Sequence, residues 1–576
     1  MRRRRQHIMH AFDLRDAKAH EIALDSSGSL HLLWAVRQQH LIYFEVTPPS
    51  EYPDSWIAVG FSDRGDLTNA DYCFMWTDYN GKLRIQDTWS DEHGILHVDY
   101  QQDCFPVRNS NGYIRWKRHL NTCDIQDYDY TIDGGTTHIV WARGRGLILS
   151  PSGINVTEGK SIDRGMVRAQ LIRADVPPGP PADAENLEVK ASKVKVPADE
   201  TTYWCHVQKL PASLTRKHHV VEFEAVIQKG NEGLVHHMEV FHCEAPPDQD
   251  IPLYVGPCQA DDRPAETQVC KKVIAAWAMG AGPFVYPEEA GLPIGGSNFS
   301  LYVMLEVHYN NPELRGDYVD SSGMRLWVTT NMRPLNAAVM ELGLEYTDKM
   351  AIPPGQKEFA LSGYCVSGCT KISLPAEGIT VFGSQLHTHL TGVWVKTRHI
   401  RNGQELPELN ADAHYSTHFQ EIRRLKRLVN IKPGDALITT CGYRTDHLKN
   451  VTLGGFAISD EMCVNYIHYY PATELEVCKS AISDHALQTY FRYMNKYENQ
   501  PTSEQLGINA NYHSIDWSPI RVEFLNELYT SESLGMQCNK SSGDRFPGDW
   551  SNTAIPKVLY PKIERKDVCP IFRIYK

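Results

Sequence analysis

Short apolar segments separated by turn-forming residues recur along most of this chain and limit it to a β architecture. Short apolar runs bounded by glycine, proline, asparagine, aspartate and serine are typical of strands, and helical periodicity is scarce between residues 198 and 478. The clearest runs are Leu30–Val36, Leu41–Val46, Trp56–Phe61, His138–Trp141, Val220–Val226, Leu234–Phe241, Leu301–Val307 and Ile379–Phe382. We therefore predict a mainly β protein built from antiparallel sandwiches.

The chain length of 576 residues corresponds to three or four domains, at roughly 150 residues each. Consecutive prolines within 174–184 enforce an extended backbone that cannot enter a central strand, so this segment predicts a linker. A turn at Pro353–Gly355 predicts a second boundary. The expected organisation is an N-terminal sandwich at 20–150, a linker at 174–197, two tandem sandwiches at 198–352 and 353–479, and a short helical tail at 480–576.

The tail is where helical patterns appear. Ser483 is a candidate cap for a helix whose apolar residues recur at helical spacing up to Tyr497. Ser518 followed by Pro519 predicts a second helix start, because proline at the first helical position loses no hydrogen bond. These helices could pack on the body of the protein or on another subunit, which leaves a non-covalent homodimer open.

The charge and hydropathy patterns exclude two classes of protein. The formal net charge is -12, whereas a nucleic-acid-binding protein needs a basic face to neutralise phosphates. No run of about 18 apolar residues occurs, so no transmembrane segment is expected. The excess of acidic over basic residues is too small to indicate a particular binding partner.

Fourteen cysteines without the spacing of a zinc ribbon favour disulfides and an oxidising compartment. Four glycosylation sequons agree with a secreted or vesicle-lumenal protein: Asn155, Asn298, Asn450 and Asn539. The start of the sequence, Met1–Ile8, is basic but has no apolar segment behind it. Either a signal peptide is missing from this sequence or the chain is not secreted, and the cysteines favour the secretory pathway.

Candidate metal ligands occur as histidines within strand-like runs. His387 and His389 are two residues apart, so on one strand both imidazoles point to the same face and could share a metal. The alternative is a pair of hydrogen-bonded histidines on a solvated strand face.

Two further groups are weaker on their own. The adjacent residues His236 and His237 would point to opposite faces of a strand, so sharing a metal requires a β-bulge or a strand end. His308 is a lone histidine in a third strand-like run. Met462 would ordinarily pack in a core, but a thioether that joins His387 and His389 would select Cu(I) over zinc.

These segments together resemble the copper type II, ascorbate-dependent monooxygenases, and the similarity extends from about residue 20 to 570. The residues that carry the resemblance are Thr201–Cys205, Leu234–Phe241, Gln385–Leu390 and Glu461–Pro471. The resemblance implies that the first sandwich is a DOMON domain and that the next two are paired copper domains. It also implies two copper ions per chain, ascorbate as electron donor and O2 as co-substrate.

Carried over residue by residue, the resemblance assigns His236, His237 and His308 to an electron-transfer copper. It assigns His387, His389 and Met462 to the copper where oxygen and substrate react, and Tyr203 to the active site, with His387 as a further catalytic residue. The disulfide pairs that it implies are Cys123–Cys569, Cys205–Cys258, Cys243–Cys270, Cys365–Cys478, Cys369–Cys538 and Cys441–Cys463. Cys73 and Cys104 remain and are paired by elimination.

The expected reaction is hydroxylation of the benzylic carbon of a phenylethylamine. Segments 340–350 and 458–461 look closer to the invertebrate members of the family, so the resemblance implies tyramine, giving octopamine, as the first candidate and dopamine, giving noradrenaline, as the second. Glu341 is one candidate partner for the substrate ammonium, although an ordinary strand glutamate is the alternative. The rival hypotheses are a non-catalytic, secreted copper-binding protein of the same fold and a peptide α-hydroxylase.

Overall fold

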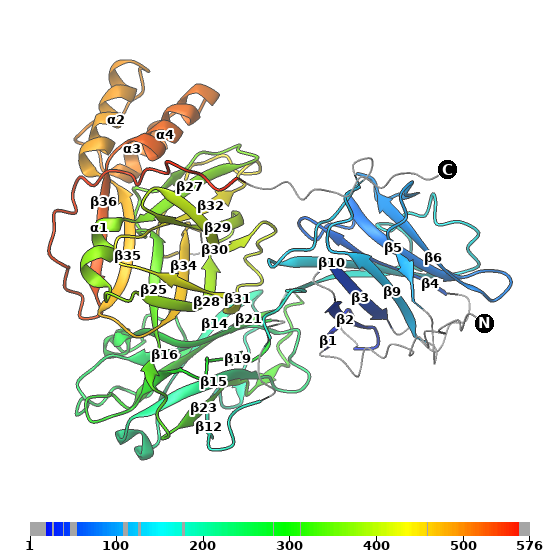
Figure 1. Ribbon diagram of the computed structural model, residues 1–576, viewed down its shortest axis with the longest axis horizontal. Coiled ribbons are helices and arrows are strands. Elements are labelled where there is room, and N and C mark those ends of the chain that lie inside the picture. Colours follow the sequence, from blue (N-terminus) through cyan, green and yellow to red (C-terminus); the bar gives the residue numbers. More distant parts are fainter. Residues whose placement is uncertain are drawn as a thin grey trace, which may run out of the picture. The chain divides into compact units, whose positions relative to one another are not determined.

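A computed structural model describes residues 19–563, except for gaps at 26–27, 38–39, 47–54, 108–112, 125–127, 176–178, 280, 312 and 458. The chain divides into two compact units, one containing the described residues up to 173 and the other those from 174 onward. Both units consist mainly of antiparallel sheets, as the pattern of apolar runs predicts (Figure 1). None of the described helices is long and apolar enough to cross a membrane.

The first unit is a sandwich of two sheets. One sheet has the strand order β1-β2-β3-β9-β8 and the other β11-β10-β4-β5-β6-β7. The side chains between the sheets are large and buried, with Trp34, Phe44, Trp116 and Trp141 among them. The strands are β1 (His20–Ala23), β2 (His31–Arg37), β3 (Leu41–Val46), β4 (Ser55–Ser62), β5 (Ala70–Thr77), β6 (Leu83–Ser90), β7 (Leu96–Val98), β8 (Phe105–Pro106), β9 (Ile114–His119), β10 (Thr137–Arg145) and β11 (Asp163–Ala169).

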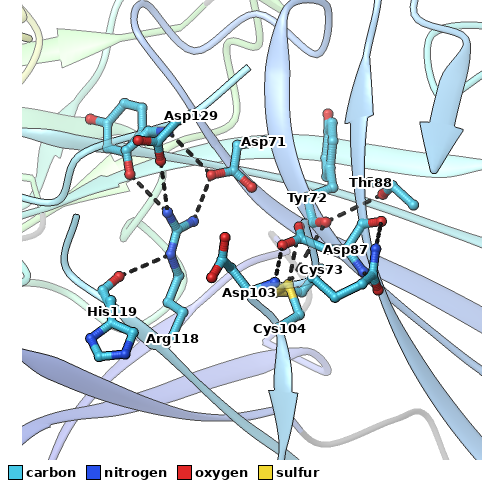
Figure 2. The surroundings of a disulfide bond; sticks show 12 residues. Asp71, Tyr72, Cys73, Asp87, Thr88, Asp103, Cys104, Arg118, His119 and Asp129 are labelled. Atoms are coloured by element: carbon cyan, nitrogen blue, oxygen red, sulfur yellow. Dashed lines mark hydrogen bonds and ion pairs between the residues drawn. A yellow bond between two sulfur atoms is a disulfide. The ribbon is translucent and has the colours of Figure 1, made fainter. Parts of the chain in front are cut away.

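A disulfide between Cys73 and Cys104 connects β5 to the loop that precedes β8. Both cysteines are buried, and Figure 2 shows them beside the carboxylate of Asp87, whose Oδ1 lies 3.4 Å from Cys104 Sγ. The bond therefore holds a long loop against the inner strands of the sandwich.

Acidic side chains surround this disulfide in the interior of the first unit (Figure 2). Arg118 Nη1 donates to Asp71 Oδ2 at 2.8 Å, and the guanidinium also pairs with Asp129. Asp87 Oδ2 accepts the backbone N–H of Asp103 at 2.6 Å. Burial raises the pKa of Asp87 well above its usual range, and the charge of Asp71 raises it further, because Arg118 compensates only part of the cost.

Replacing Cys73 and Cys104 together by alanine is expected to destabilise the first unit by roughly 3–4 kcal/mol, the loop-closure entropy for a crosslink of this span. The two cysteines are 31 residues apart. Calorimetry of the full chain should show a lower unfolding temperature for one transition, while the second unit unfolds as before. An unchanged thermogram would contradict the role assigned to the bond.

The carboxyl of Asp87 makes the stability of the first unit depend on pH. Because its folded pKa is raised above the unfolded value of about 3.9, the folded state retains this proton at higher pH. The free energy of unfolding should therefore fall as pH rises from about 4 towards the folded pKa. Asp87→Asn should remove this dependence and stabilise the unit at pH 7 by roughly 1–3 kcal/mol. A steeper pH dependence in the variant would contradict this account.

The second unit begins with another sandwich. Its sheets have the orders β12-β23-β15-β20-β24 and β17-β14-β21-β16-β18. The strands are β12 (Glu185–Lys190), β13 (Val194–Lys195), β14 (Thr201–Lys209), β15 (His218–Val226), β16 (Val235–Cys243), β17 (Val255–Pro257), β18 (Cys270–Ala278), β19 (Phe284–Val285), β20 (Ala290–Ile294), β21 (Tyr302–Asn310), β22 (Val319–Asp320), β23 (Gly323–Thr329) and β24 (Leu335–Asn336).

A third sandwich follows in the same unit, with sheets ordered β31-β28-β34-β25-β35-β36 and β27-β32-β29-β30. Its strands are β25 (Ala338–Leu344), β26 (Ala351–Ile352), β27 (Phe359–Cys365), β28 (Ile379–His387), β29 (Gly392–Arg401), β30 (Gln404–Asp412), β31 (Arg423–Ile431), β32 (Ala436–Tyr443), β33 (Thr452–Leu453), β34 (Val464–Tyr470), β35 (Leu475–Ile482) and β36 (Leu534–Lys540).

Strand pairing moves the expected segment boundaries. Strand β12 pairs with β23, so the second half of the expected linker at 174–197 belongs to a sheet. Strand β25 pairs with β34 and β35, so the third sandwich begins near residue 338 and not at the turn Pro353–Gly355. The segment 185–190 is partly polar and was expected within the linker, whereas 338–344 was expected in the preceding sandwich. In both cases partners distant in sequence decide which sheet a strand joins.

In its described residues, 480–563, the tail contains three α-helices and the strand β36. Helix α2 (Asp484–Lys496) is capped by Ser483, whose hydroxyl accepts the backbone N–H of Ala486, and α4 (Pro519–Ser531) starts at the predicted proline. Helix α3 (Ile508–Ser514) and strand β36 were not predicted, and β36 pairs with β35. Figure 1 shows α2, α3 and α4 gathered at one end of the third sandwich. The remaining helix, α1 (Ser367–Ser373), lies between β27 and β28.

Disulfides also connect strands in the second unit. The pairs in the described residues are Cys205–Cys258, Cys243–Cys270, Cys365–Cys478, Cys369–Cys538 and Cys441–Cys463. These are pairs that the resemblance implies. The expected partner of Cys123, Cys569, lies outside the described residues. Because Cys538 belongs to β36, its bond to Cys369 attaches the tail to the third sandwich.

Candidate metal centres

Strand β16 contains a β-bulge at the first histidine pair. In its pairing with β21, Val235 faces Tyr309 and His237 faces His308, so His236 is an extra residue without a partner of its own in the ladder. A bulge reorients the side chain of the inserted residue. As a result, two adjacent histidines can turn to one face of the sheet, where β21 places His308.

The three imidazoles converge through the same ring nitrogen. His237 Nδ1 lies 3.2 Å from His236 Nδ1 and 3.2 Å from His308 Nδ1. Burial lowers the pKa of His308 to about 4, and burial together with the neighbouring histidines lowers the pKa of His237 well below its usual value. The imidazoles of His237 and His308 are therefore neutral at pH 7, which is the form that binds a metal.

Tyr203 on β14 packs against this group. Its ring stacks on His308 with the centroids 4.5 Å apart and the planes 6° apart. Burial raises the pKa of the Tyr203 hydroxyl to about 12, with smaller contributions from Glu306 and Glu239. Tyr203 thus orients a ligand candidate by ring contact. Glu306 and Glu239 face each other across β21 and β16, next to the histidines.

A second group forms where β28 ends. His387 is the last residue of the strand and His389 lies just beyond it, with their ring centroids 5.2 Å apart and nearly perpendicular at 88°. Gln420 Oε1 lies 2.5 Å from His387 Nδ1, and the Asp460 carbonyl lies 2.9 Å from His389 Nδ1. Both oxygens are acceptors, so each histidine donates its Nδ1–H to one of them. Each ring then keeps the lone pair of its Nε2 for a metal.

Glu461 joins the two segments that carry His389 and Met462. Its Oε2 accepts the backbone N–H of His389 at 2.9 Å and of Met462 at 3.2 Å. Its Oε1 accepts the N–H and the hydroxyl of Thr391 at 2.6 and 2.7 Å. The Tyr443 hydroxyl donates to the Met462 carbonyl at 2.7 Å, so buried Met462 is fixed on both sides of its peptide.

The donor atoms of both groups fit copper. Three neutral imidazoles suit a copper that cycles between oxidation states, and two imidazoles with a thioether favour Cu(I). In the first group the nitrogen separations of 3.2 Å are those of atoms that could share one ion. The sequence predicts the ligand candidates. It does not predict the hydrogen bonds that Glu461 and Gln420 make to the second group, or the contact of His418 with His236.

Glu341 is less suited to a substrate ammonium than the sequence suggests. Lys479 Nζ lies 2.5 Å from Glu341 Oε2, and the Tyr346 hydroxyl donates to the same oxygen at 3.1 Å. The carboxylate charge is therefore already balanced within the third sandwich.

The expected glycosylation sites differ in exposure. Asn298 and Asn450 are exposed, whereas Asn155 and Asn539 are partly buried. Asn155 also accepts hydrogen bonds from the N–H and the hydroxyl of Thr157, the third residue of its sequon. Attachment of a glycan needs an accessible side-chain amide, so exposure favours Asn298 and Asn450.

Comparison with known proteins identifies the family. Models of the DOMON domain and of the N- and C-terminal domains of copper type II ascorbate-dependent monooxygenases match residues 26–144, 187–316 and 335–491. Dopamine beta-hydroxylase of Homo sapiens is 44% identical over 96% of this chain and 89% of that protein. Tyramine beta-hydroxylase of Caenorhabditis briggsae is 39% identical over 91% and 89%, and DBH-like monooxygenase protein 1 of Mus musculus is 31% identical over 95% and 89%.

The chain therefore belongs to the copper type II ascorbate-dependent monooxygenase family, and it carries the DOMON domain as its first unit. The resemblance read from the histidine segments is confirmed, and so is the mainly β fold. The cluster of His236, His237 and His308 is consistent with a copper site of that family.

Glu461→Ala is expected to weaken copper binding at the second group, because the backbones of His389 and Met462 lose their common acceptor. Loss of a residue that hydrogen-bonds to a metal ligand typically lowers the affinity for the metal about 10–100-fold. Isothermal copper titration of the full chain measures this effect, with exposed Glu532→Ala as the matched control. Unchanged affinity at both sites would show that Glu461 has no part in forming the site.

Proposed function

We propose that this chain hydroxylates the benzylic carbon of a phenylethylamine, with tyramine as the first candidate substrate and octopamine as its product. Two copper ions, ascorbate and O2 complete the proposed reaction. The observation that carries the proposal is the occurrence, in one compact unit, of an all-histidine group and of a second histidine pair whose backbone is joined to that of Met462 through Glu461. A carrier protein would need only one of these sites.

The ligand types support different roles for the two groups. When bound, copper supplies the one-electron chemistry and oxygen activation that C–H hydroxylation requires. In the balanced reaction, one oxygen atom of O2 enters the C–H bond and the other leaves as water, which consumes two electrons from ascorbate and two protons. His236, His237 and His308 would hold the electron-transfer copper, and His387, His389 and Met462 the copper at the reaction site.

Proximity of the two groups supports this division. The charge of His387, on the third sandwich, contributes to lowering the pKa of His237, on the second, as does His418. Direct contacts support the same proximity. His418 Nδ1 lies 3.2 Å from His236 Nε2, and Gln420 Oε1, two residues later, lies 2.5 Å from His387 Nδ1. One loop of the third sandwich therefore contacts both groups, which supports their joint action on one substrate.

Glu239 is a better candidate than Glu341 for the substrate ammonium. It lies two residues after His237 on the same face of β16, and no ion pair to it is found among the described residues. Burial, together with the charge of Glu306, raises the pKa of Glu239 to about 8, so this carboxyl holds a proton at pH 7. Binding of an ammonium ion beside it would release that proton and stabilise the carboxylate.

An enzyme of this kind would distinguish tyramine from dopamine only weakly. The substrates differ by one ring hydroxyl, and a mainly apolar pocket separates such a pair by only about 100-fold at most. Identities of 44% to a dopamine hydroxylase and 39% to a tyramine hydroxylase keep dopamine as the second candidate.

The disulfides indicate the cellular compartment in which the enzyme would work. These bonds persist in oxidising compartments, which supports a vesicle lumen or secretion. Exposed aromatic and aliphatic residues on the tail helices, including Tyr493, Tyr497 and Ile520, support a non-covalent homodimer through this end. The domain scheme proposed is a DOMON sandwich up to about residue 173 and two copper domains that meet near residue 337.

A competition assay tests the proposal. Copper-loaded protein receives ascorbate, O2 and equal amounts of tyramine and dopamine, and products are counted by mass. We expect octopamine to predominate, and Met462→Ala to lose more than about 100-fold in turnover while the first site keeps its copper. Met332→Ala, on an exposed methionine outside both groups, is the control.

Each outcome of this assay has a distinct meaning. Predominant noradrenaline would retain the reaction and replace the substrate. Hydroxylation of a glycine-extended peptide in place of either amine would move the chain to peptide chemistry. Copper binding without any hydroxylated product would contradict the enzymatic role and leave a copper-binding protein.

A further inference from the structure

The loop between β30 and β31 contributes one side chain to each histidine group. His418 Nδ1 lies 3.2 Å from His236 Nε2, with the rings nearly perpendicular at 88°. Two residues later, Gln420 Oε1 lies 2.5 Å from His387 Nδ1. We call residues 416–420 the bridging segment, because it contacts both groups from the third sandwich.

Each contact is made to the ring nitrogen of a ligand candidate that is not expected to bind the metal, which we call its outer nitrogen. His236 directs Nδ1 towards His237, so Nε2 points away from the group. His387 uses Nδ1 for Gln420, which leaves Nε2 for a metal. A hydrogen bond at the outer nitrogen fixes the tautomer and orientation of an imidazole and makes it a stronger donor. By contrast, His308 Nε2 is buried without a hydrogen-bond partner among the described residues.

The bridging segment is itself held in place. Phe419 is buried, and its N–H donates to the Ser416 carbonyl at 3.0 Å. Gln385 Nε2 donates to the Gln420 carbonyl at 3.0 Å, and Gln420 Nε2 donates to the Thr417 carbonyl at 2.7 Å. The segment therefore cannot shift relative to the end of β28, where His387 lies, without breaking several bonds.

The contact with His236 is of a different kind. His418 remains exposed, although it reaches from the third sandwich to a strand of the second. A hydrogen bond at an exposed position contributes little to stability, because water can replace either partner. Its effect is thus on the position of the two groups relative to one another and not on the folding of either sandwich.

We propose that His418 is a positioning residue that ties the first copper site to the second through the bridging segment. His418 orients His236 across the space between the sandwiches, and Gln420 orients His387 at the other end of the same segment. This inference rests on the proposed function, since it assumes that both groups hold copper. It adds a residue that sets the separation of the two sites and the donor strength of one ligand.

The test uses the full chain loaded with copper and oxidised, in which dipolar broadening of the electron paramagnetic resonance signal reports the separation of the two ions. We expect His418→Ala to keep both copper ions but to reduce this broadening. The reduction potential of the first site should rise, because His236 becomes a weaker donor. Amine turnover should fall roughly 10–100-fold in kcat with little change in KM.

Two further variants separate positioning from general damage. His418→Asn keeps a hydrogen-bonding side chain and should restore part of the broadening and of kcat. His447→Ala removes an exposed histidine of the same sandwich and should behave as the wild type. If His418→Ala retains the wild-type broadening and potential, the inference is overturned, whatever happens to turnover.

The spectroscopic result does not depend on the substrate. Loss of broadening in His418→Ala, in a protein that hydroxylates no amine, would support the positioning role and overturn the proposed function. A wild-type chain that binds only one copper ion would overturn both.

Discussion

The β-bulge at His236 is the constraint on which the proposed first copper site depends. A regular strand alternates its side chains between faces, so adjacent histidines would lie on opposite sides of β16. The inserted residue breaks this alternation where β16 meets β21, and His308 lies on the neighbouring strand at the same level. The order β14-β21-β16 then brings Tyr203 onto the ring of His308. Without the bulge, the sheet would offer two histidines and not three.

The second site depends on hydrogen bonds more than on sheet geometry. His389 and Met462 lie outside the regular strands, and the side chain of Glu461 accepts the backbone N–H groups of both. The disulfide between Cys441 and Cys463 secures the residue next to Met462. A thioether ligand has no strong directional bond of its own, so its position has to come from the backbone around it. The buried carboxylate and the disulfide supply that position.

Much of this arrangement could be predicted from the sequence. The spacing of apolar runs predicts the β-sandwiches, and Ser483 and Pro519 predict where two of the helices begin. The shared face of the HxH pair, and the need for a bulge or a strand end at His236, followed from strand geometry alone. The grouping of His308 with His236 required the family resemblance, because nothing local in its strand marks it as a ligand candidate.

Other features could not be predicted, for physical reasons. Strands β12, β25 and β36 are held by partners far away in the chain, and local pattern carries no information on such pairing. Lys479 neutralises Glu341 from a neighbouring strand, which the sequence around Glu341 does not reveal. His418 and Gln420 act through contacts across 182 and 33 residues of sequence. Side chains that position ligands are visible only once the fold is known.

The central claim is that one unit of this chain holds two copper sites with different ligand atoms. X-ray absorption at the copper edge of the reduced, fully loaded protein tests it most directly, because sulfur and nitrogen scatter at distinguishable distances. The account predicts two copper ions per chain, with a sulfur neighbour that belongs to only one of them. A spectrum with nitrogen neighbours alone, or a protein that saturates at one copper ion, would contradict it.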